Sequence, residues 1–323
     1  MPDAKPTVIH SNRVPDDYYG PLLDIAEIIQ PDDPLKPFLP AKTYDLARET
    51  QAEALMVAGE YKINAELLES IPSIKIVANV AVGYDNFNLP EMTAHGVWGT
   101  NTPDAFVDAT ADATFALLLG WARSIPKADR FVRALEWPQA GIGQARWEGM
   151  ELRGKTIGII GYGKIGEAVA QRAEAFGMSV IFSRRQETGD PRQRTVQQLL
   201  SESDVVSLHT PLTPETNQLI DAAALKSMKS SAVLVNMARG KVVDEAALVE
   251  ALASGQIAGA ALDVFEDEPN VHPGLLEMEN VVLVPHIGGA TREARKAARL
   301  TASENIAQVL RGERPLTPLN EIS

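Results

Sequence analysis

Cysteine is missing from this sequence altogether. Its absence excludes a disulfide framework, a thiolate nucleophile and any metal site with cysteine ligands, and we expect no metal site of another kind. Long apolar segments are missing too. No run approaches the roughly 18 residues of a membrane-spanning helix, and the opening MPDAKPTVIH lacks the apolar core of a secretory leader. We therefore expect a cytoplasmic protein that does not engage a membrane.

An excess of positive charge is also absent. The chain has 30 Lys and Arg against 43 Asp and Glu, a formal net charge of −13, which argues against binding to nucleic acid or to anionic membrane surfaces. An anionic substrate would need local positive charge at its site, so individual arginines become informative. With 323 residues, of which 45% are hydrophobic, the chain is long enough for two soluble domains, each with its own core.

Residues 155–185 read KTIGIIGYGKIGEAVAQRAEAFGMSVIFSRR and alternate between strand-like and helix-like composition. The apolar, β-branched run Thr156–Ile160 predicts a strand buried on both faces. The alanine-rich run Lys164–Phe176 has apolar residues on one helical face and is followed by Gly177, which is typical of a helix C-terminus. A second strand is predicted over Ser179–Ser183, so the stretch indicates a strand–helix–strand unit.

The glycines Gly161, Gly163 and Gly166 follow the first strand in G-x-G-x-x-G spacing. In such a turn the first glycine permits the sharp bend, the second lets the backbone approach a pyrophosphate, and the third lets helix and strand pack closely. Phosphates would lie at the helix N-terminus, which adds Lys164 and Ile165 to the candidate cofactor residues. A structural turn can have this spacing, but its place inside a unit of about 30 residues indicates dinucleotide binding.

The end of the second strand bears on the choice of dinucleotide. An NAD site usually has Asp or Glu about 20 residues past the first glycine, bound to the ribose 2′-OH. This chain has Ser183, Arg184 and Arg185 there. A hydroxyl and two guanidinium groups would bind a 2′-phosphate through charge-assisted hydrogen bonds, so we predict NADPH as the preferred cofactor, with NADH as the second option. The alternative is a pair of solvated arginines.

The whole chain predicts an α/β fold with two doubly wound parallel-sheet (Rossmann/flavodoxin-like) domains and a cleft between them. We assign residues 1–100 plus 290–323 to a substrate-binding domain and residues 101–289 to a dinucleotide-binding domain. The strands expected in the first domain are Thr7–His10, Ala54–Val57 and Lys75–Val80. The helices expected there are Tyr18–Ile29, Ala65–Ser70 and a last helix, Thr291–Leu310, that returns from the end of the chain.

In the second domain a long helix is expected over about 105–124, followed by a polar segment, 126–153, that carries Trp137 and Trp147. Those two side chains suit a subunit contact, a pocket lid or packing within the chain. Beyond Arg185 helices alternate with strands. The expected helices are Thr195–Ser201, Asp221–Met228 and Asp244–Ser254, and the expected strands are Asp204–Leu208, Ala232–Val235, Ala258–Leu262 and Val281–Val284.

Three polar side chains follow strands of this second sheet, where ligands of such folds bind. Arg239 follows AVLVN, Glu268 lies in the segment after Asp263, and His286 follows VVLV. Hydride transfer to a carbonyl needs a proton donor and a cation that polarises the oxygen, and His and Arg can supply these. Taken singly, each residue could instead be a surface ion pair, a solvated loop residue or a core histidine. Their common position favours a catalytic site.

The motifs GYGKIG, NMARGKVVDEAAL, ALDVFEDEP and VPHIGGAT occur in this order, and through them the chain resembles the D-isomer-specific 2-hydroxyacid dehydrogenases along nearly its whole length. NVAVGYDN and TNTPDAFVDATAD are most similar to the glyoxylate/hydroxypyruvate reductase branch, which commonly uses NADPH. The resemblance implies an NADPH-dependent oxidoreductase that reduces small 2-oxo acids, glyoxylate and hydroxypyruvate first, to 2-hydroxy acids.

The resemblance also implies residue roles. Arg239 would bind the substrate carboxylate and carbonyl, His286 would be the general acid/base, and Glu268 would hold and tune His286. The backbone N–H groups of Val82 and Gly83 would anchor the carboxylate; the turn that contains them could be an anion nest or an ordinary strand-to-helix turn. The remaining candidate cofactor contacts are Thr110, Thr216, Asp263 and Gly288.

Members of this family are usually dimers paired through the long helix and the segment after it, so we expect a homodimer. The resemblance would also place Trp147 at the partner's active site, which the sequence alone does not decide. Two alternatives stay open. One is an NAD-dependent D-3-phosphoglycerate or D-lactate dehydrogenase. The other is a non-enzymatic, dinucleotide-sensing protein similar to the family's transcriptional corepressors, which keep the same three polar residues.

Overall fold

The computed structural model describes residues 5–141 and 143–322, and the chain divides into two compact units. Unit 1 extends to Phe106 and resumes at Ala290, whereas unit 2 is Val107–Gly289. The expected division differs at one junction, since the first unit ends at Phe106 instead of residue 100. Both units are parallel α/β sheets, which confirms the predicted fold class. The expected cleft between them stays a prediction.

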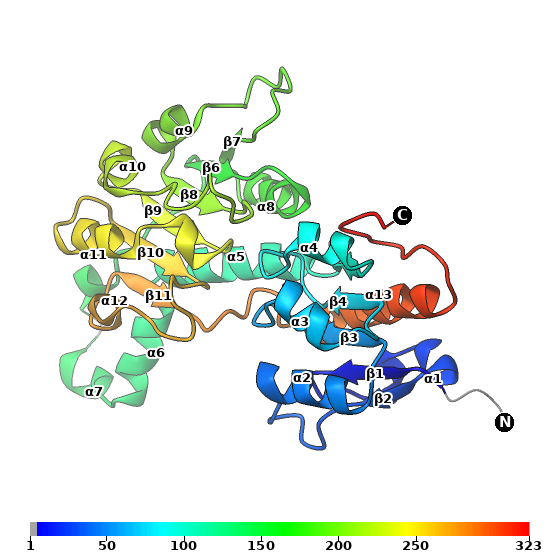
Figure 1. The fold of residues 1–323 in the computed structure, drawn as a ribbon. Coiled ribbons are helices and arrows are strands. Elements are labelled where there is room, and N and C mark those ends of the chain that lie inside the picture. Colours follow the sequence, from blue (N-terminus) through cyan, green and yellow to red (C-terminus); the bar gives the residue numbers. More distant parts are fainter. Residues whose placement is uncertain (1–4, 142, 323) are drawn as a thin grey trace. The chain divides into compact units, whose positions relative to one another are not determined.

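Unit 1 contains a five-stranded sheet in the order β2-β1-β3-β4-β5 (Figure 1). Its strands are β1 (Thr7–His10), β2 (Glu27–Ile29), β3 (Ala54–Val57), β4 (Ile76–Asn79) and β5 (Trp98–Thr100). Its helices are η1 (Asp16–Tyr18), α1 (Leu22–Ile25), α2 (Pro40–Glu49), α3 (Ala65–Ser70), α4 (Leu89–Ala94) and α13 (Arg292–Leu310).

Strand residues of unit 1 alternate between two apolar cores, because successive side chains point to opposite faces. Val8 packs with residues of α1 and α13, while its neighbour Ile9 packs with residues of α2, α3 and α4. Helix α13 contacts β3, β4 and β5 although it lies about 200 residues later in the chain. It therefore belongs to the first unit, as expected (Figure 1).

One expected element of unit 1 is wrong. The region Tyr18–Ile29 is not one helix: α1 ends at Ile25, Ala26 is extended, and Glu27–Ile29 pairs with β1 as strand β2. Pairing with the free edge of β1 satisfies the backbone of this short segment, which outweighs its helical pattern. Strand β5 and helix α2 were not expected. Helix α2 begins with Pro40, which is tolerated at a first helical position because no N–H bond is needed there.

Unit 2 contains a six-stranded sheet in the order β11-β10-β9-β8-β6-β7. Its strands are β6 (Thr156–Ile160), β7 (Ser179–Ser183), β8 (Val205–Leu208), β9 (Val233–Asn236), β10 (Gly259–Leu262) and β11 (Val281–Leu283). Each strand expected here is present within one residue of its predicted bounds. The helices are α5 (Val107–Ala122), α6 (Ile125–Arg133), α7 (Trp137–Ala140), η2 (Gln144–Trp147), α8 (Lys164–Ala175), α9 (Val196–Glu202), α10 (Ala222–Ser227), η3 (Gly240–Val242), α11 (Glu245–Ala253) and α12 (Pro273–Leu276).

Both faces of this sheet are covered. Ile159 belongs to the core that includes α5 and α8, and the adjacent Ile160 belongs to the core that includes α9, α10 and α11. Strand β6 lies between β7 and β8, so the chain changes direction across the sheet at β6 and β8. Such a switch point, at the carboxyl ends of the strands, is where ligands of open α/β sheets bind.

Candidate active site

The glycine turn after β6 has the geometry that its spacing predicts. Gly161 has a φ of 97°, and a Cβ on it would lie 2.5 Å from the His209 carbonyl carbon. A Cβ on Gly166 would lie 2.3 Å from the carbonyl oxygen of Gly161. A Cβ on Gly163, by contrast, would meet no atom within 4 Å. Open space therefore lies beside the N-terminus of α8, where Lys164 and Ile165 begin the helix and where the positive end of the helix dipole favours an anion.

The three residues predicted to face the ribose lie at the end of β7 and directly after it. Ser183 is buried at the strand end, whereas Arg184 and Arg185 are exposed. A nitrogen of Arg185 lies 3.8 Å from a carboxylate oxygen of Glu215. The hydroxyl of Thr216 accepts from the Thr213 N–H and donates to the Pro211 carbonyl, at 2.7 Å each, so it stabilises its own loop.

Another arginine, not predicted from the sequence, lies beside this strand. The rings of Tyr162 and Phe182 stack with centroids 3.8 Å apart, and the Arg192 guanidinium lies 5.7 Å from the Phe182 centroid. Asp190 and Glu174 form ion pairs with Arg192. No sequence signal marks Arg192, because the stacked rings and Glu174 are brought next to it only by the fold.

His286 and Glu268 lie together at the carboxyl edge of the unit 2 sheet. His286 Nδ1 is 2.7 Å from Glu268 Oε2, and the Phe265 N–H donates to Glu268 Oε1 at 3.0 Å. The His286 side chain is 52% exposed, so its ring is accessible to a substrate. Arg239 follows β9, which pairs with β10, and β10 in turn pairs with β11, the strand before His286. The three residues predicted to be catalytic are thus on adjacent loops.

A close contact between the β9 and β10 loops makes this arrangement possible. A Cβ on Gly240 would lie 1.8 Å from the Phe265 carbonyl carbon, so only glycine fits next to Arg239. The Asn236 side chain closes the Arg239 loop: its amide donates to the Arg239 carbonyl at 3.1 Å, and its carbonyl accepts from the Ala238 N–H at 3.0 Å.

Asp263 ties down the loop that carries His286. Its buried carboxylate accepts the Ile287 N–H at 2.6 Å and the Gly288 N–H at 2.9 Å, and its carbonyl accepts the His286 N–H at 2.8 Å. His286 has a φ of 51°, a conformation that non-glycine residues adopt only when their surroundings impose it. Asp263 thus orients the histidine loop. Thr110 of α5 lies beside Gly288, since its methyl would be 3.7 Å from a Cβ there.

These contacts shift the pKa values in opposite directions. The hydrogen bond to Glu268 raises the pKa of His286, and the charges of Glu268 and Asp263 add to it. Burial opposes ionisation of Glu268, but its hydrogen bond to His286 and the nearby positive charge outweigh burial and lower its pKa. Burial raises the pKa of Asp263 despite its backbone donors. Between the pKa values of Glu268 and His286 the pair is a carboxylate and an imidazolium, which can donate a proton.

In unit 1, the turn after β4 holds Val82 and Gly83 by their carbonyl groups. The Asn101 amide donates to the Val82 carbonyl at 2.7 Å, and the Asn79 amide donates to the Gly83 carbonyl at 2.8 Å. In the described part of the chain the N–H groups of Val82 and Gly83 donate to no acceptor. Anchored carbonyls with unused N–H groups are the features of an anion nest. The two asparagines were not predicted.

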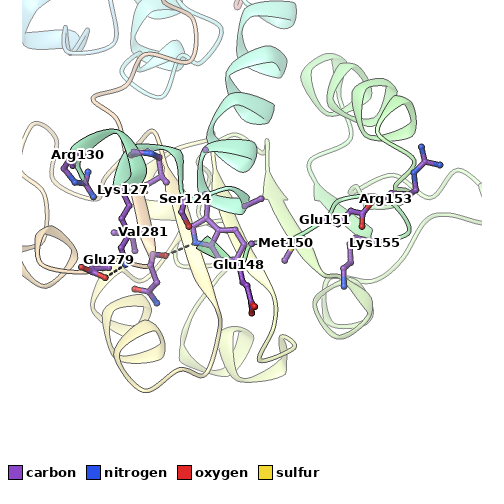
Figure 2. Close-up of a pocket in the computed structure, with 17 residues that line it drawn as sticks. Ser124, Lys127, Arg130, Glu148, Met150, Glu151, Arg153, Lys155, Glu279 and Val281 are labelled. Carbon is purple, nitrogen blue, oxygen red and sulfur yellow. Dashed lines mark hydrogen bonds and ion pairs between the residues drawn. The ribbon is translucent and has the colours of Figure 1, made fainter. Parts of the chain in front are cut away.

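A cavity of about 800 Å³ lies elsewhere in unit 2 (Figure 2). It is lined by the end of α5, by α6 and by residues before β6 and β11, including Trp121, Lys127 and Lys155. It is therefore at the amino edge of the sheet, opposite to His286. Trp147 packs edge-on against Phe131, with ring centroids 5.2 Å apart, so it has a partner within its own chain.

Residues 5–141 and 143–322 lack two features. No group of three or more His, Asp or Glu side chains is arranged to hold a metal ion. No described helix combines the length and the apolar content that crossing a bilayer requires.

Comparison with known proteins agrees with this geometry. The family model described as "D-isomer specific 2-hydroxyacid dehydrogenase, NAD binding domain" matches residues 115–288. The chain is 46% identical over 284 residues to a glyoxylate reductase of Pyrococcus furiosus, which covers 85% of this chain and 84% of the relative. It is 42% identical to a glyoxylate reductase of Thermococcus litoralis, over 98% of this chain and 97% of the relative.

A solved structure is similar over nearly the whole chain. It is an NADPH-dependent glyoxylate/hydroxypyruvate reductase from Sinorhizobium meliloti in complex with NADP and malonate. The TM-score is 0.86 at 33% identity, covering 98% of this chain and 97% of the other. Together with the glycine turn and the His286–Glu268 pair, these likenesses place the chain in the D-isomer-specific 2-hydroxyacid dehydrogenase family, in its glyoxylate reductase branch, as an NAD(P)-dependent oxidoreductase.

Proposed function

We propose that this enzyme uses NADPH to reduce small 2-oxo acids, with glyoxylate and hydroxypyruvate as the preferred substrates. The observation that carries the proposal is the 2.7 Å hydrogen bond between His286 and Glu268, on loops next to that of Arg239. The names of its glyoxylate reductase relatives support the substrate class. The exposed Arg184 and Arg185 at the end of β7, and the NADPH-dependent structural relative, support the cofactor.

Separate residues would bind the substrate and transfer the proton. Arg239 binds the substrate carboxylate and polarises the carbonyl oxygen, and the N–H groups of Val82 and Gly83 anchor the carboxylate. The bound nicotinamide supplies the hydride. Glu268 holds His286 through Nδ1, so Nε2 is the atom that protonates the carbonyl oxygen.

The unit β6–α8–β7 would bind the cofactor. The open space at Gly163, at the N-terminus of α8, would hold its pyrophosphate. Ser183, Arg184 and Arg185 bind the 2′-phosphate. Thr110, Thr216, Asp263 and Gly288 complete the set of cofactor residues.

We infer in addition that the enzyme is a homodimer. Large apolar side chains on and around α6 and α7 are solvent-exposed in the single chain: Ile125 by 57%, Leu135 by 70% and Trp137 by 50%. Helix α6 also borders the cavity of Figure 2, which Lys127 and Arg130 line. A second copy would cover this surface. A position of Trp147 near the partner's active site and a location in the cytoplasm stay predictions.

Initial rates of NADPH and NADH oxidation with glyoxylate, hydroxypyruvate, pyruvate and phosphohydroxypyruvate test the proposal. Fast turnover of the first two with NADPH is expected. Turnover of pyruvate or phosphohydroxypyruvate with NADH alone would favour the D-lactate or D-3-phosphoglycerate dehydrogenase. Cofactor binding without turnover of any of these acids would favour a dinucleotide-sensing protein.

A further inference from the structure

The segment that carries Glu268 is attached to helix α11 by one buried side chain. Glu245, the first residue of α11, is 7% exposed. Its Oε2 accepts the Glu266 N–H at 2.9 Å, and its Oε1 accepts the His272 N–H at 2.9 Å. The two oxygens thus hold the two ends of the segment 266–272, and Glu268 lies between these ends.

Burying a charged carboxylate costs free energy unless other groups pair with it or donate hydrogen bonds to it. The partners of Glu245 therefore indicate its role. No Lys or Arg forms an ion pair with it in the part of the chain that the structure describes. Nor does α11 need it as a cap, because Asp244 accepts the Ala247 N–H at 2.9 Å. The hydrogen bonds of the Glu245 carboxylate therefore all go to the 266–272 segment. Its negative charge is stabilised by its position at the N-terminus of α11.

The loop is fixed at its start by a second contact. Gly240 leaves no room between the β9 loop and the backbone of Phe265 and Glu266. Glu245 then fixes Glu266 and, at the far end, His272. Between these points the Glu268 side chain has to reach both the Phe265 N–H and His286 Nδ1. Its position therefore depends on both ends of the segment.

We propose that Glu245 is a positioning residue for the acid/base pair: it holds the 266–272 segment so that Glu268 stays within hydrogen-bond distance of His286. It touches neither substrate nor cofactor and acts only through Glu268. The inference rests on the proposed role of His286 as proton donor.

The test is the pH dependence of kcat/KM for glyoxylate reduction in Glu245→Gln. The amide keeps the size of the side chain but has a single acceptor oxygen, so one of the two backbone N–H groups loses its partner. Glu268 then leaves His286, whose pKa falls toward its ordinary value. The descending limb of the profile moves to lower pH by about one unit, while KM for NADPH stays the same.

Two matched variants separate positioning from general stability. Glu250→Gln removes the same charge from the exposed side of α11 and should leave the limb unchanged. Leu252→Ala destabilises α11 from its buried face and should lower the melting temperature without moving the limb. If Glu245→Gln behaves like Leu252→Ala, Glu245 is merely structural and the inference is wrong.

A double-mutant cycle with Glu268→Gln shows whether Glu245 acts through Glu268. In the Glu268→Gln background, Glu245→Gln should move the limb no further; additive shifts would overturn the inference. If Glu245→Gln does not fold, Glu245→Asp, which keeps the charge but shortens the reach, should give a smaller shift. If Glu268→Gln has the same descending limb as the wild type, the proposed acid/base pair is wrong. The inference about Glu245 is then wrong as well.

Discussion

His286 is held in its left-handed conformation by its loop contacts to Asp263, and its ring is oriented by Glu268. As the proposed proton donor it acts on the chemical step more than on binding. His286→Ala should therefore lower kcat by about 10²- to 10⁴-fold with little change in KM. Steady-state kinetics on glyoxylate measure both constants, and an unchanged kcat would remove His286 from the mechanism.

The pair of His286 and Glu268 makes both rate and stability depend on pH. Because the pKa of His286 is raised, reduction should proceed at low pH and slow as the pH rises through that pKa. Glu268→Gln removes the largest cause of the shift, so the decline should begin at lower pH. A pH profile of kcat/KM for both proteins measures this, and coincident profiles would contradict the pairing.

Both shifts stabilise the fold, but the two contributions are lost in opposite directions of pH. The raised pKa of His286 stabilises the fold below its ordinary value of about 6.5, and this is lost as the pH rises through the folded value. The lowered pKa of Glu268 stabilises the fold above about 4.3, and this is lost as the pH falls through the folded value. The difference in melting temperature between wild type and Glu268→Gln should thus be largest between these limits.

The choice of cofactor depends on individual charges at the end of β7. A variant with Arg184→Asp and Arg185→Ala repels a 2′-phosphate and offers a carboxylate to a ribose 2′-OH. Its KM for NADPH should rise about 10- to 100-fold, the equivalent of a lost charge-assisted hydrogen bond, while NADH becomes the better cofactor. Arg314→Ala, which removes a surface charge of unit 1 paired with Glu321, is the matched control. An unchanged KM for NADPH would contradict the 2′-phosphate assignment.

At the scale of elements, two glycines of unit 2 should respond differently to the same added methyl group. Gly163→Ala meets no protein atom and should fold normally, but its methyl enters the proposed phosphate position and should raise KM for both cofactors. Gly240→Ala collides with Phe265 and should lower the free energy of unfolding by about 1–3 kcal/mol. Urea unfolding and cofactor kinetics separate the two. Gly59→Ala, in open space in unit 1, is the neutral control.

For the whole molecule, the expected mass in solution is twice 34.9 kDa. Leu135→Glu places a charge on the exposed apolar surface of unit 2 and should shift the protein toward the monomer in light scattering after size exclusion. Leu35→Glu, at an equally apolar but separate position of unit 1 that is 88% exposed, should leave the mass unchanged. A monomeric wild type would refute the homodimer.

The sequence by itself determined the elements whose pattern is local. The run Thr156–Ile160 is a strand buried on both faces, and a continuous run of apolar, β-branched residues predicts such a strand. Glycine spacing likewise predicted the turn at Gly161, because only glycine suits that φ and that close approach. The carboxyl ends of parallel strands lie at one edge of a sheet. The sequence could therefore also predict that the loops of Arg239, Glu268 and His286 are neighbours.

The tertiary structure decided what depends on partners distant in the chain. The segment Glu27–Ile29 becomes a strand only because β1 offers a free edge. Glu245 and the asparagines of the Val82 turn lie within motifs, but no sequence pattern indicates which backbone groups they hold, and Asp263 was expected only as a cofactor contact. Their roles arise because hydrogen bonds act over about 3 Å, and only the fold brings a carboxylate or an amide that close to the backbone it holds.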